Sequence, residues 1–163
     1  MDAPDEIRPF TRSSKQSLRA WLHLIKCSKR VEQAISDLFR SRHASSLSRF
    51  DVLAHLEHAG PDGMTTSALA QRLLASKGNI TRLLDRMIAD GLIERRPSEE
   101  DRRVNYVCLT GTGMEVFRRM AADHEAWSEE IFGILSDREL EQLIGLLDRV
   151  RANVDQRRGR PGA

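Results

Sequence analysis

The chain has 163 residues, 40% of them hydrophobic, and a formal net charge of +2 at pH 7. This length supports one compact core, or an elongated domain completed by a partner, and leaves little room for two separate domains. The net charge is too small to indicate a nucleic-acid-binding protein by itself, so the distribution of charge must decide. Residues 8–49 hold ten bases and two acids, whereas residues 104–155 hold ten acids and five bases.

The sequence shows no sign of a disulfide framework, a zinc motif, a membrane span or a signal peptide. Cys27 and Cys108 are far apart and neither belongs to a CxxC motif, which argues against a disulfide framework or a zinc site. No apolar run approaches the roughly 18 residues of a membrane span, and MDAPDEIRPF lacks the blocks of a signal peptide. Residues 1–14 and 157–163 are rich in polar residues, proline and glycine, which predicts flexible ends. We therefore expect a cytoplasmic protein without a membrane contact.

Two helices are predicted in the first part of the chain. From Lys15 to about Arg42, apolar residues recur every three to four positions, which predicts one long helix. A second helix is expected near Ser48, because Ser48 and Asp51 have the spacing of a capping box. Its buried stripe is predicted to consist of Phe50, Val52, Leu53 and Leu56. The turn-forming residues GPDG at 60–63 end it.

The next two helices are short and joined by a tight turn. TTSALAQRLL at 65–74 can be capped by Thr65 or Thr66. KGNITRLLDRMIADG at 77–91 is amphipathic, and Gly91 is a plausible left-handed stop. Its apolar residues are Ile80, Leu83, Leu84, Met87 and Ile88. Its opposite face carries Lys77, Asn79, Thr81, Arg82, Asp85 and Arg86. This is the pattern of a helix-turn-helix whose second helix presents donors suited to phosphates and base edges.

A β-hairpin is predicted directly after this unit. LIERR at 92–96 can pair with VNYVCL at 104–109, joined by the charged connection PSEEDRR at 97–103. Alternation along the second strand points Val107 and Leu109 inward and Cys108 outward. A hairpin with a charged tip after a helix-turn-helix predicts a winged helix, mostly α with a small β-hairpin wing.

The C-terminal part continues with two apolar helical stripes. One runs from Gly113 to about Leu135, and the next opens at Ser136, where Ser136 and Glu139 have capping-box spacing. These stripes exceed what a winged helix at 46–110 could cover. We therefore expect residues 15–45 and 111–156 to form dimerisation helices around a two-fold axis. Such a dimer would read an inverted-repeat operator in double-stranded DNA.

The run from LSRFDVLAHLEHAG to DGLIERRPSEEDRRVNYVCLTGTG resembles the MarR family of transcriptional regulators. The resemblance rests on the order of the recognition helix, DGLIERR, DRR, and LT before a long helix, over more than half the chain. It implies a homodimeric, nucleoid-associated DNA-binding protein without a cofactor, commonly a repressor released by a small ligand. By matching position, Arg103 is expected in the minor groove, and Asp101 is expected to hold the wing arginine in place.

We predict DNA contacts from the second short helix and from the wing. Asn79 and Arg82 can make bidentate contacts to base edges, whereas Lys77, Thr81 and Arg86 suit phosphates. The alternative is a solvated helix face and a solvated loop with weak surface ion pairs. The complete set of predicted DNA contacts is Ser76, Lys77, Asn79, Thr81, Arg82, Arg86, Asp101, Arg102 and Arg103.

A site for a small aromatic effector is a second prediction. Trp21, Asp51 and Arg95 resemble positions used by a urate-responsive branch of the family, but Leu83 stands where that branch has an arginine. A tryptophan near a cation suits a phenolic acid or aromatic carboxylate, and the bases Arg8, Arg12, Lys15 and Arg19 could meet the phosphates of a coenzyme A thioester. The alternative is structural: Trp21 in the core, Asp51 as a cap and Arg95 exposed.

Three other classes of protein compete with a ligand-responsive regulator. A thiol redox sensor could use Cys27, which lies near Lys26 and Lys29, but the tyrosines of peroxide-sensing relatives are missing apart from Tyr106. An enzyme or metal protein is disfavoured, because His55 and His58 lack a third ligand and no HExxH motif is present. A winged helix that contacts only proteins is the remaining alternative.

Overall fold

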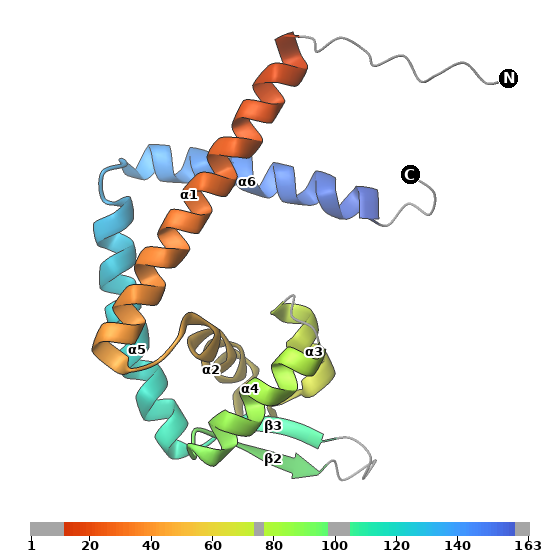
Figure 1. Cartoon of the computed structure of the whole chain (residues 1–163), viewed down its shortest axis with the longest axis vertical. Coiled ribbons are helices and arrows are strands. Elements are labelled where there is room, and N and C mark those ends of the chain that lie inside the picture. Colours follow the sequence, from red (N-terminus) through yellow and green to blue (C-terminus); the bar gives the residue numbers. More distant parts are fainter. Residues whose placement is uncertain (1–11, 74–76, 98–104, 159–163) are drawn as a thin grey trace, which may run out of the picture. The chain divides into compact units, whose positions relative to one another are not determined.

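A computed structural model describes residues 12–73, 77–97 and 105–158 (Figure 1). It divides into two compact units, Met1–Met120 and Ala121–Ala163. In chain order the elements are α1 (Arg12–His43), α2 (Leu47–Ala59), the 3-10 turn η1 (Gly60–Asp62), β1 (Met64–Thr65), α3 (Thr66–Arg72), α4 (Lys77–Ala89), β2 (Ile93–Pro97), β3 (Asn105–Leu109), α5 (Gly111–Phe132) and α6 (Asp137–Arg158). The mostly helical fold with a small wing is confirmed.

The core of the first unit lies where α2 meets its neighbours. The Phe39 ring of α1 packs on Phe50 of α2 at 4.9 Å between centroids, and Phe50 stacks on Phe117 of α5 at 5.8 Å. The predicted apolar face of α2 is buried in full: Phe50, Val52, Leu53 and Leu56. Burial of such side chains is worth about 1.5–3 kcal/mol each. The periodicity therefore identified the face of α2 correctly.

The predicted cap of α2 was wrong. The helix begins two residues earlier than Ser48 suggested, and Ser46 is the N-cap, with its hydroxyl accepting from the backbone N–H of Arg49 at 3.3 Å. Ser46 has the extended backbone of an N-cap, which Ser48 inside the helix cannot adopt. Asp51 is consequently one turn into the helix rather than at its reciprocal capping position.

The strands form a three-stranded antiparallel sheet in the order β1-β3-β2. Pairing of β2 with β3 confirms the hairpin, with Arg95 opposite Val107 and Glu94 opposite Cys108. The short strand β1 was missed, because two residues carry no detectable alternation. It makes β3 the central strand, with Met64 opposite Val107.

The expectation that Cys108 faces outward was wrong. The side chain is only 2% exposed, and its Sγ lies 3.8 Å from the carbonyl oxygen of Asp62 in η1. Gly63 permits this close approach: its φ of 67° is left-handed, and a Cβ there would overlap the carbonyl oxygen of Val107. Because the turn from η1 to β1 folds back onto β3, the second face of that strand is covered as well.

The helix boundary at Ser136 was predicted correctly. Glu139 accepts hydrogen bonds from the backbone N–H and the hydroxyl of Ser136, at 2.9 and 2.7 Å. These bonds lower the pKa of the Glu139 carboxyl, the backbone bond most strongly. No helix among the described residues is long and apolar enough to cross a membrane.

Candidate nucleic-acid interface

Helices α3 and α4 form the helix-turn-helix expected from the sequence. Thr65 caps α3 by accepting from the backbone N–H of Ala68 at 3.2 Å, which decides between the two threonines. Helix α4 buries Ile80, Leu84 and Met87 almost completely. Its opposite side exposes Asn79, Thr81, Arg82, Asp85 and Arg86. The predicted contacts Asn79, Thr81, Arg82 and Arg86 therefore share one exposed face.

Two of these residues contact each other. Nη2 of Arg82 donates to Oδ1 of Asn79 at 3.0 Å, one helical turn apart. This bond occupies the amide's carbonyl oxygen and holds the guanidinium along the outer face of α4. A bidentate contact from Arg82 to a guanine would need a defined side-chain direction, which the hydrogen bond to Asn79 favours.

Ion pairs fasten α4 to the elements beside it. Asp85 accepts from Arg95 of β2 at 2.6 Å, and Asp90, directly after α4, pairs with Arg49 of α2. Helix α4 ends in a Schellman-type turn in which Gly91 has a φ of 69° and Leu92 donates to the carbonyl of Met87 at 3.0 Å. Sequence reasoning missed Asp90 and Arg49, since a pair 41 residues apart leaves no local pattern.

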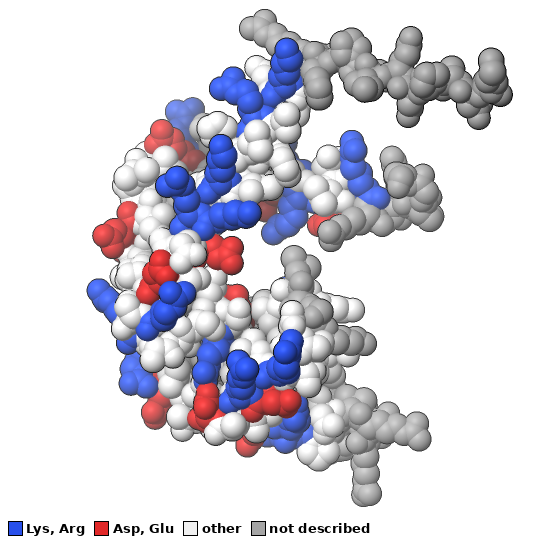
Figure 2. Space-filling model, viewed as in Figure 1, with Lys and Arg blue, Asp and Glu red and all other residues white. Residues whose placement is uncertain are grey.

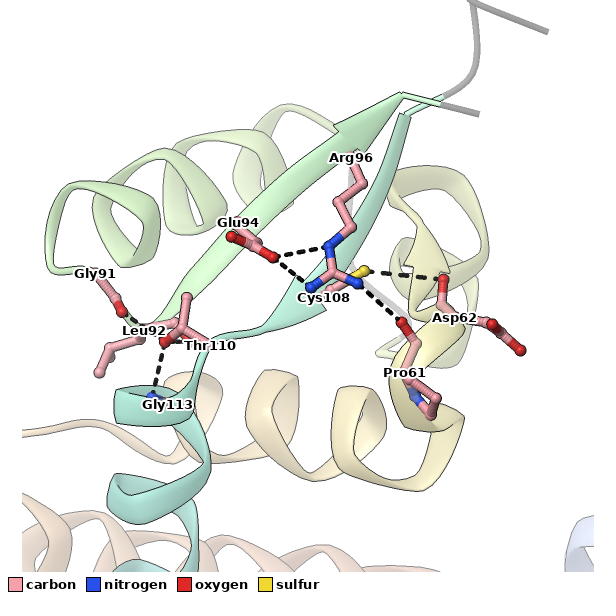
Figure 3. Close-up of polar contacts among 9 residues, drawn as sticks. All are labelled: Pro61, Asp62, Gly91, Leu92, Glu94, Arg96, Cys108, Thr110 and Gly113. Carbon is pink, nitrogen blue, oxygen red and sulfur yellow. Dashed lines mark hydrogen bonds and ion pairs between the residues drawn. The ribbon is translucent and has the colours of Figure 1, made fainter. Parts of the chain in front are cut away.

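The wing uses its two faces differently. Alternation puts Arg95 on the face that meets α4, and Glu94, Arg96 and Cys108 on the other face (Figure 3). Arg96 donates from Nε to Glu94 at 2.7 Å and from Nη1 to the carbonyl of Pro61 at 3.4 Å. The Glu94 hydrogen bond raises the pKa of Arg96, which stays charged. Arg96 thus ties β2 to the η1 turn, a role that the sequence did not indicate.

Thr110 joins the wing to the long helix α5. Its hydroxyl donates toward the carbonyl of Gly91 at 2.7 Å and accepts from the backbone N–H of Gly113 at 2.9 Å (Figure 3). Gly113 is packed so closely that a Cβ there would overlap the carbonyl oxygen of Leu92. The LT-G-x-G sequence therefore fixes the start of α5 against the end of the helix-turn-helix.

Part of the predicted interface lies outside the described residues. Ser76 and the wing-tip residues Asp101, Arg102 and Arg103 are in this group, and Lys77 is described only as the first residue of α4. Their DNA contacts stay predictions.

The predicted effector residues occupy separate places. Trp21 and Arg19 are exposed on the first half of α1, Trp21 by 55%, so Trp21 is not a core residue of this chain by itself. Arg95 is engaged by Asp85. Asp51 lines two cavities of about 400 and 210 Å³ that share Ser46 and Ser48. The larger is also lined by Leu73 and by Asn79, Ile80 and Leu83 of α4, and neither cavity is lined by Trp21, Arg19 or Arg95.

The two cysteines differ in accessibility. Cys27 is exposed on α1, whereas burial raises the pKa of the Cys108 thiol, an effect that the charge of nearby Arg96 only partly offsets. A raised thiol pKa leaves less of the reactive thiolate at neutral pH. Within the described ranges, no group of three or more His, Cys, Asp or Glu residues could hold a metal ion.

In the folded protein, we expect Cys27 to react rapidly with Ellman's reagent and Cys108 at least about 100-fold more slowly, because Cys108 reacts only after local opening. The Cys27→Ser variant should release thionitrobenzoate mainly after urea is added, whereas Cys108→Ser should keep the rapid phase of the wild type and lack the phase that urea reveals. Equal rates for Cys27→Ser with and without urea would contradict the observed burial.

The geometry defines a winged helix-turn-helix protein, and comparison with known proteins supports this class. A family model described as the MarR family matches residues 46–104. The HTH-type transcriptional regulator PrsX of Escherichia coli is 30% identical over 131 residues, covering 80% of this chain and 78% of PrsX. PecS of Dickeya dadantii, also an HTH-type transcriptional regulator, is 30% identical over 132 residues, covering 80% of this chain and 79% of PecS. The chain belongs to the MarR family.

Among solved structures, the chain is similar to AbsC, a MarR family transcriptional regulator from Streptomyces coelicolor. The TM-score is 0.79 with 23% sequence identity, and the match covers 91% of this chain and 99% of AbsC. At that identity the likeness establishes a shared fold.

Proposed function

We propose that this protein is a homodimeric transcriptional regulator that binds an inverted-repeat operator through α4 and the wing, and acts as a repressor released by a small aromatic ligand. The observation that carries the proposal is the exposed polar face of α4, held beside the wing by the Asp85–Arg95 ion pair. MepR of S. aureus, a structural neighbour with a TM-score of 0.71, was solved as a DNA complex. The proposal assigns no catalysis and places the protein at the nucleoid.

Exposed apolar side chains support the homodimer. In the first unit, Leu18, Trp21, Leu22 and Leu24 of α1 are each at least 40% exposed. In the second unit, α6 exposes a larger set: Leu143, Ile144, Leu146, Leu147, Val150 and Val154. Large apolar side chains clustered along an exposed helix are typical of an interface. A second copy that covers these side chains would bring two copies of α4 into one dimer, as an inverted-repeat operator requires.

The wing provides the direct test of DNA binding. Arg103→Ala should weaken operator affinity by about tenfold or more at moderate salt, because an arginine in a narrow minor groove gains from its negative potential. Fluorescence anisotropy would measure the affinity, and light scattering would confirm that the variant still forms the wild-type oligomer. The control is Glu99→Gln, which changes a residue of the same wing tip but removes no arginine. Unchanged affinity of Arg103→Ala would refute a functional wing.

The cavity beside Asp51 supports a phenolic effector. Its volume of about 400 Å³ lies within the usual range for small-ligand sites, and its wall includes the Asp51 carboxylate, two serines and Asn79. A phenolic hydroxyl can donate to Asp51, whereas a carboxylate there would be repelled. The organohalide sensor RdhR, a neighbour with a TM-score of 0.74, was solved with 2,4-dichlorophenol. Because Asn79, Ile80 and Leu83 of α4 form one wall of the cavity, a ligand bound there would contact α4, the proposed recognition helix, directly.

A thermal-shift screen of phenols, phenolic acids, their coenzyme A thioesters and urate tests the effector proposal. A phenol that binds the native state should stabilise the wild type by RT ln(1 + [L]/Kd), and this stabilisation raises the Tm. The rise in Tm should be smaller for Asp51→Asn. Glu57→Gln, on the same helix but outside this cavity, should respond like the wild type. No shift with any compound would remove the aromatic-ligand proposal while leaving DNA binding intact.

A further inference from the structure

The first half of α1 carries an unusual concentration of positive charge. Five basic side chains are exposed between residues 15 and 30, and the first acid of the helix is Glu32. Within the parts of the chain that the structure describes, none of the five forms an ion pair. We define them as the basic stripe: Lys15, Arg19, Lys26, Lys29 and Arg30. Figure 2 shows basic side chains gathered where α1 begins.

The stripe is confined to one side of the helix. At 3.6 residues per turn, its five positions fall within about 100° of the circumference and extend over about 23 Å. Trp21 and Ile25 lie outside this sector, on the apolar side, and Leu22 is its only apolar member. A dimer formed through the apolar side, with Leu22 included, would reach one edge of this sector and leave the opposite edge, with Arg19 and Arg30, accessible.

Two helical segments elsewhere pair charges of opposite sign. Further along α1, Asp37 pairs with Arg40 at 3.2 Å, and on α6 Asp148 pairs with Arg151 at 2.8 Å. Solvated helix faces usually intersperse both signs in this manner, because uncompensated like charges repel one another. The stripe departs from this rule over four turns, and a polyanionic partner would relieve the repulsion.

The stripe is also distant from the recognition helix along the chain. Helix α1 buries only Ile35 and Phe39, in its second half, where Phe39 contacts α2. Arg30 precedes Phe39 by about 14 Å of helix, and Lys15 by about 36 Å. The basic side chains therefore lie beyond the part of α1 that packs on α2. A duplex bound by α4 need not reach them.

We propose that the basic stripe binds the sugar-phosphate backbone of a second DNA segment while α4 and the wing hold the operator. A duplex carries one negative charge per 1.7 Å of axis when both strands are counted, so a segment of about 23 Å carries about 13 phosphates, and those on its near side can meet the stripe. A row of basic side chains on one helix, with no aromatic side chain in the same sector, suits a regular phosphate backbone. Such contacts do not depend on the DNA sequence. The inference goes beyond the proposed function and depends on it only for the first DNA contact.

The test is capture of one duplex by protein bound to another. Full-length protein would be loaded on an immobilised duplex of about 20 bp, long enough for two half-sites, and then exposed to a labelled duplex in solution. The wild type should capture the second duplex. The variant Lys15→Gln/Arg19→Gln/Lys26→Gln should lose about tenfold or more of this capture at moderate salt, with a lower salt dependence of about 0.9 per lost phosphate contact. Its loading on the first duplex should be unchanged.

The matched control removes three exposed arginines from α6: Arg138→Gln/Arg149→Gln/Arg157→Gln. It has the same net charge and should capture like the wild type. Failure of the wild type to load on any duplex would refute DNA binding itself. Normal loading with equal capture by both variants, or no capture by the wild type, overturns only the stripe proposal. Preferential binding of polyglutamate to the stripe would identify an acidic protein as the partner and overturn it too.

Discussion

Arg82→Ala is expected to weaken operator binding by about tenfold to a hundredfold, which corresponds to the 1–3 kcal/mol of a bidentate base contact. Arg82 is exposed on the outer face of α4 and is oriented by its 3.0 Å hydrogen bond to Asn79. The loss should be large for the operator and small for random-sequence DNA, because a base contact contributes to specificity more than to general affinity. Anisotropy titrations with both duplexes at several salt concentrations measure this difference.

The Asn79→Ala variant shows whether Asn79 only orients Arg82 or also contacts a DNA base itself. If Asn79 only orients Arg82, its removal should cost less than removal of the arginine, and the double variant should bind like Arg82→Ala. Arg118→Ala is the matched control, since Arg118 is exposed on α5, outside the α4 face. A uniform loss for operator and random DNA would show that Arg82 contacts phosphates, and an unchanged affinity would show that this face of α4 does not read the operator.

Gly113→Ala is expected to destabilise the protein by about 3–5 kcal/mol, at the upper end of single-substitution effects. The added methyl group would overlap the carbonyl oxygen of Leu92, and backbone cannot move aside as a flexible side chain can. The displacement would also disturb Thr110, which bonds both Gly91 and Gly113. We therefore expect loss of DNA affinity to accompany the lower urea midpoint.

Gly111→Ala is the matched control in the same helix. Nothing lies within 4 Å of a Cβ at Gly111, so its stability should stay within about 0.5 kcal/mol of the wild type. Urea unfolding followed by circular dichroism gives the midpoint and the slope for each variant. If Gly113→Ala unfolded at the wild-type midpoint, the close packing of α5 on Leu92 would be refuted.

The sequence was sufficient wherever the physics is local. The buried faces of α2 and α4 follow from helical periodicity, because each helix meets the core along one stripe. Thr65, Gly91 and the Ser136–Glu139 box mark helix ends, since caps act within one turn. The same patterns identified the winged helix and the polar face with Asn79 and Arg82.

The tertiary structure decided how these parts are held together. Cys108 became buried because η1 and the Gly63 turn cover the second face of β3, and no periodicity in the sequence announces that turn. The pairs Arg49–Asp90 and Arg95–Asp85 join residues distant along the chain, and the sequence contains no signal for such pairing. The sequence by itself therefore determined the main helices, the hairpin and the polar face of α4, through short-range periodicity and capping. Only the folded chain brought the wing, η1 and α2 into the contacts that hold that face in place, because those contacts depend on proximity in space.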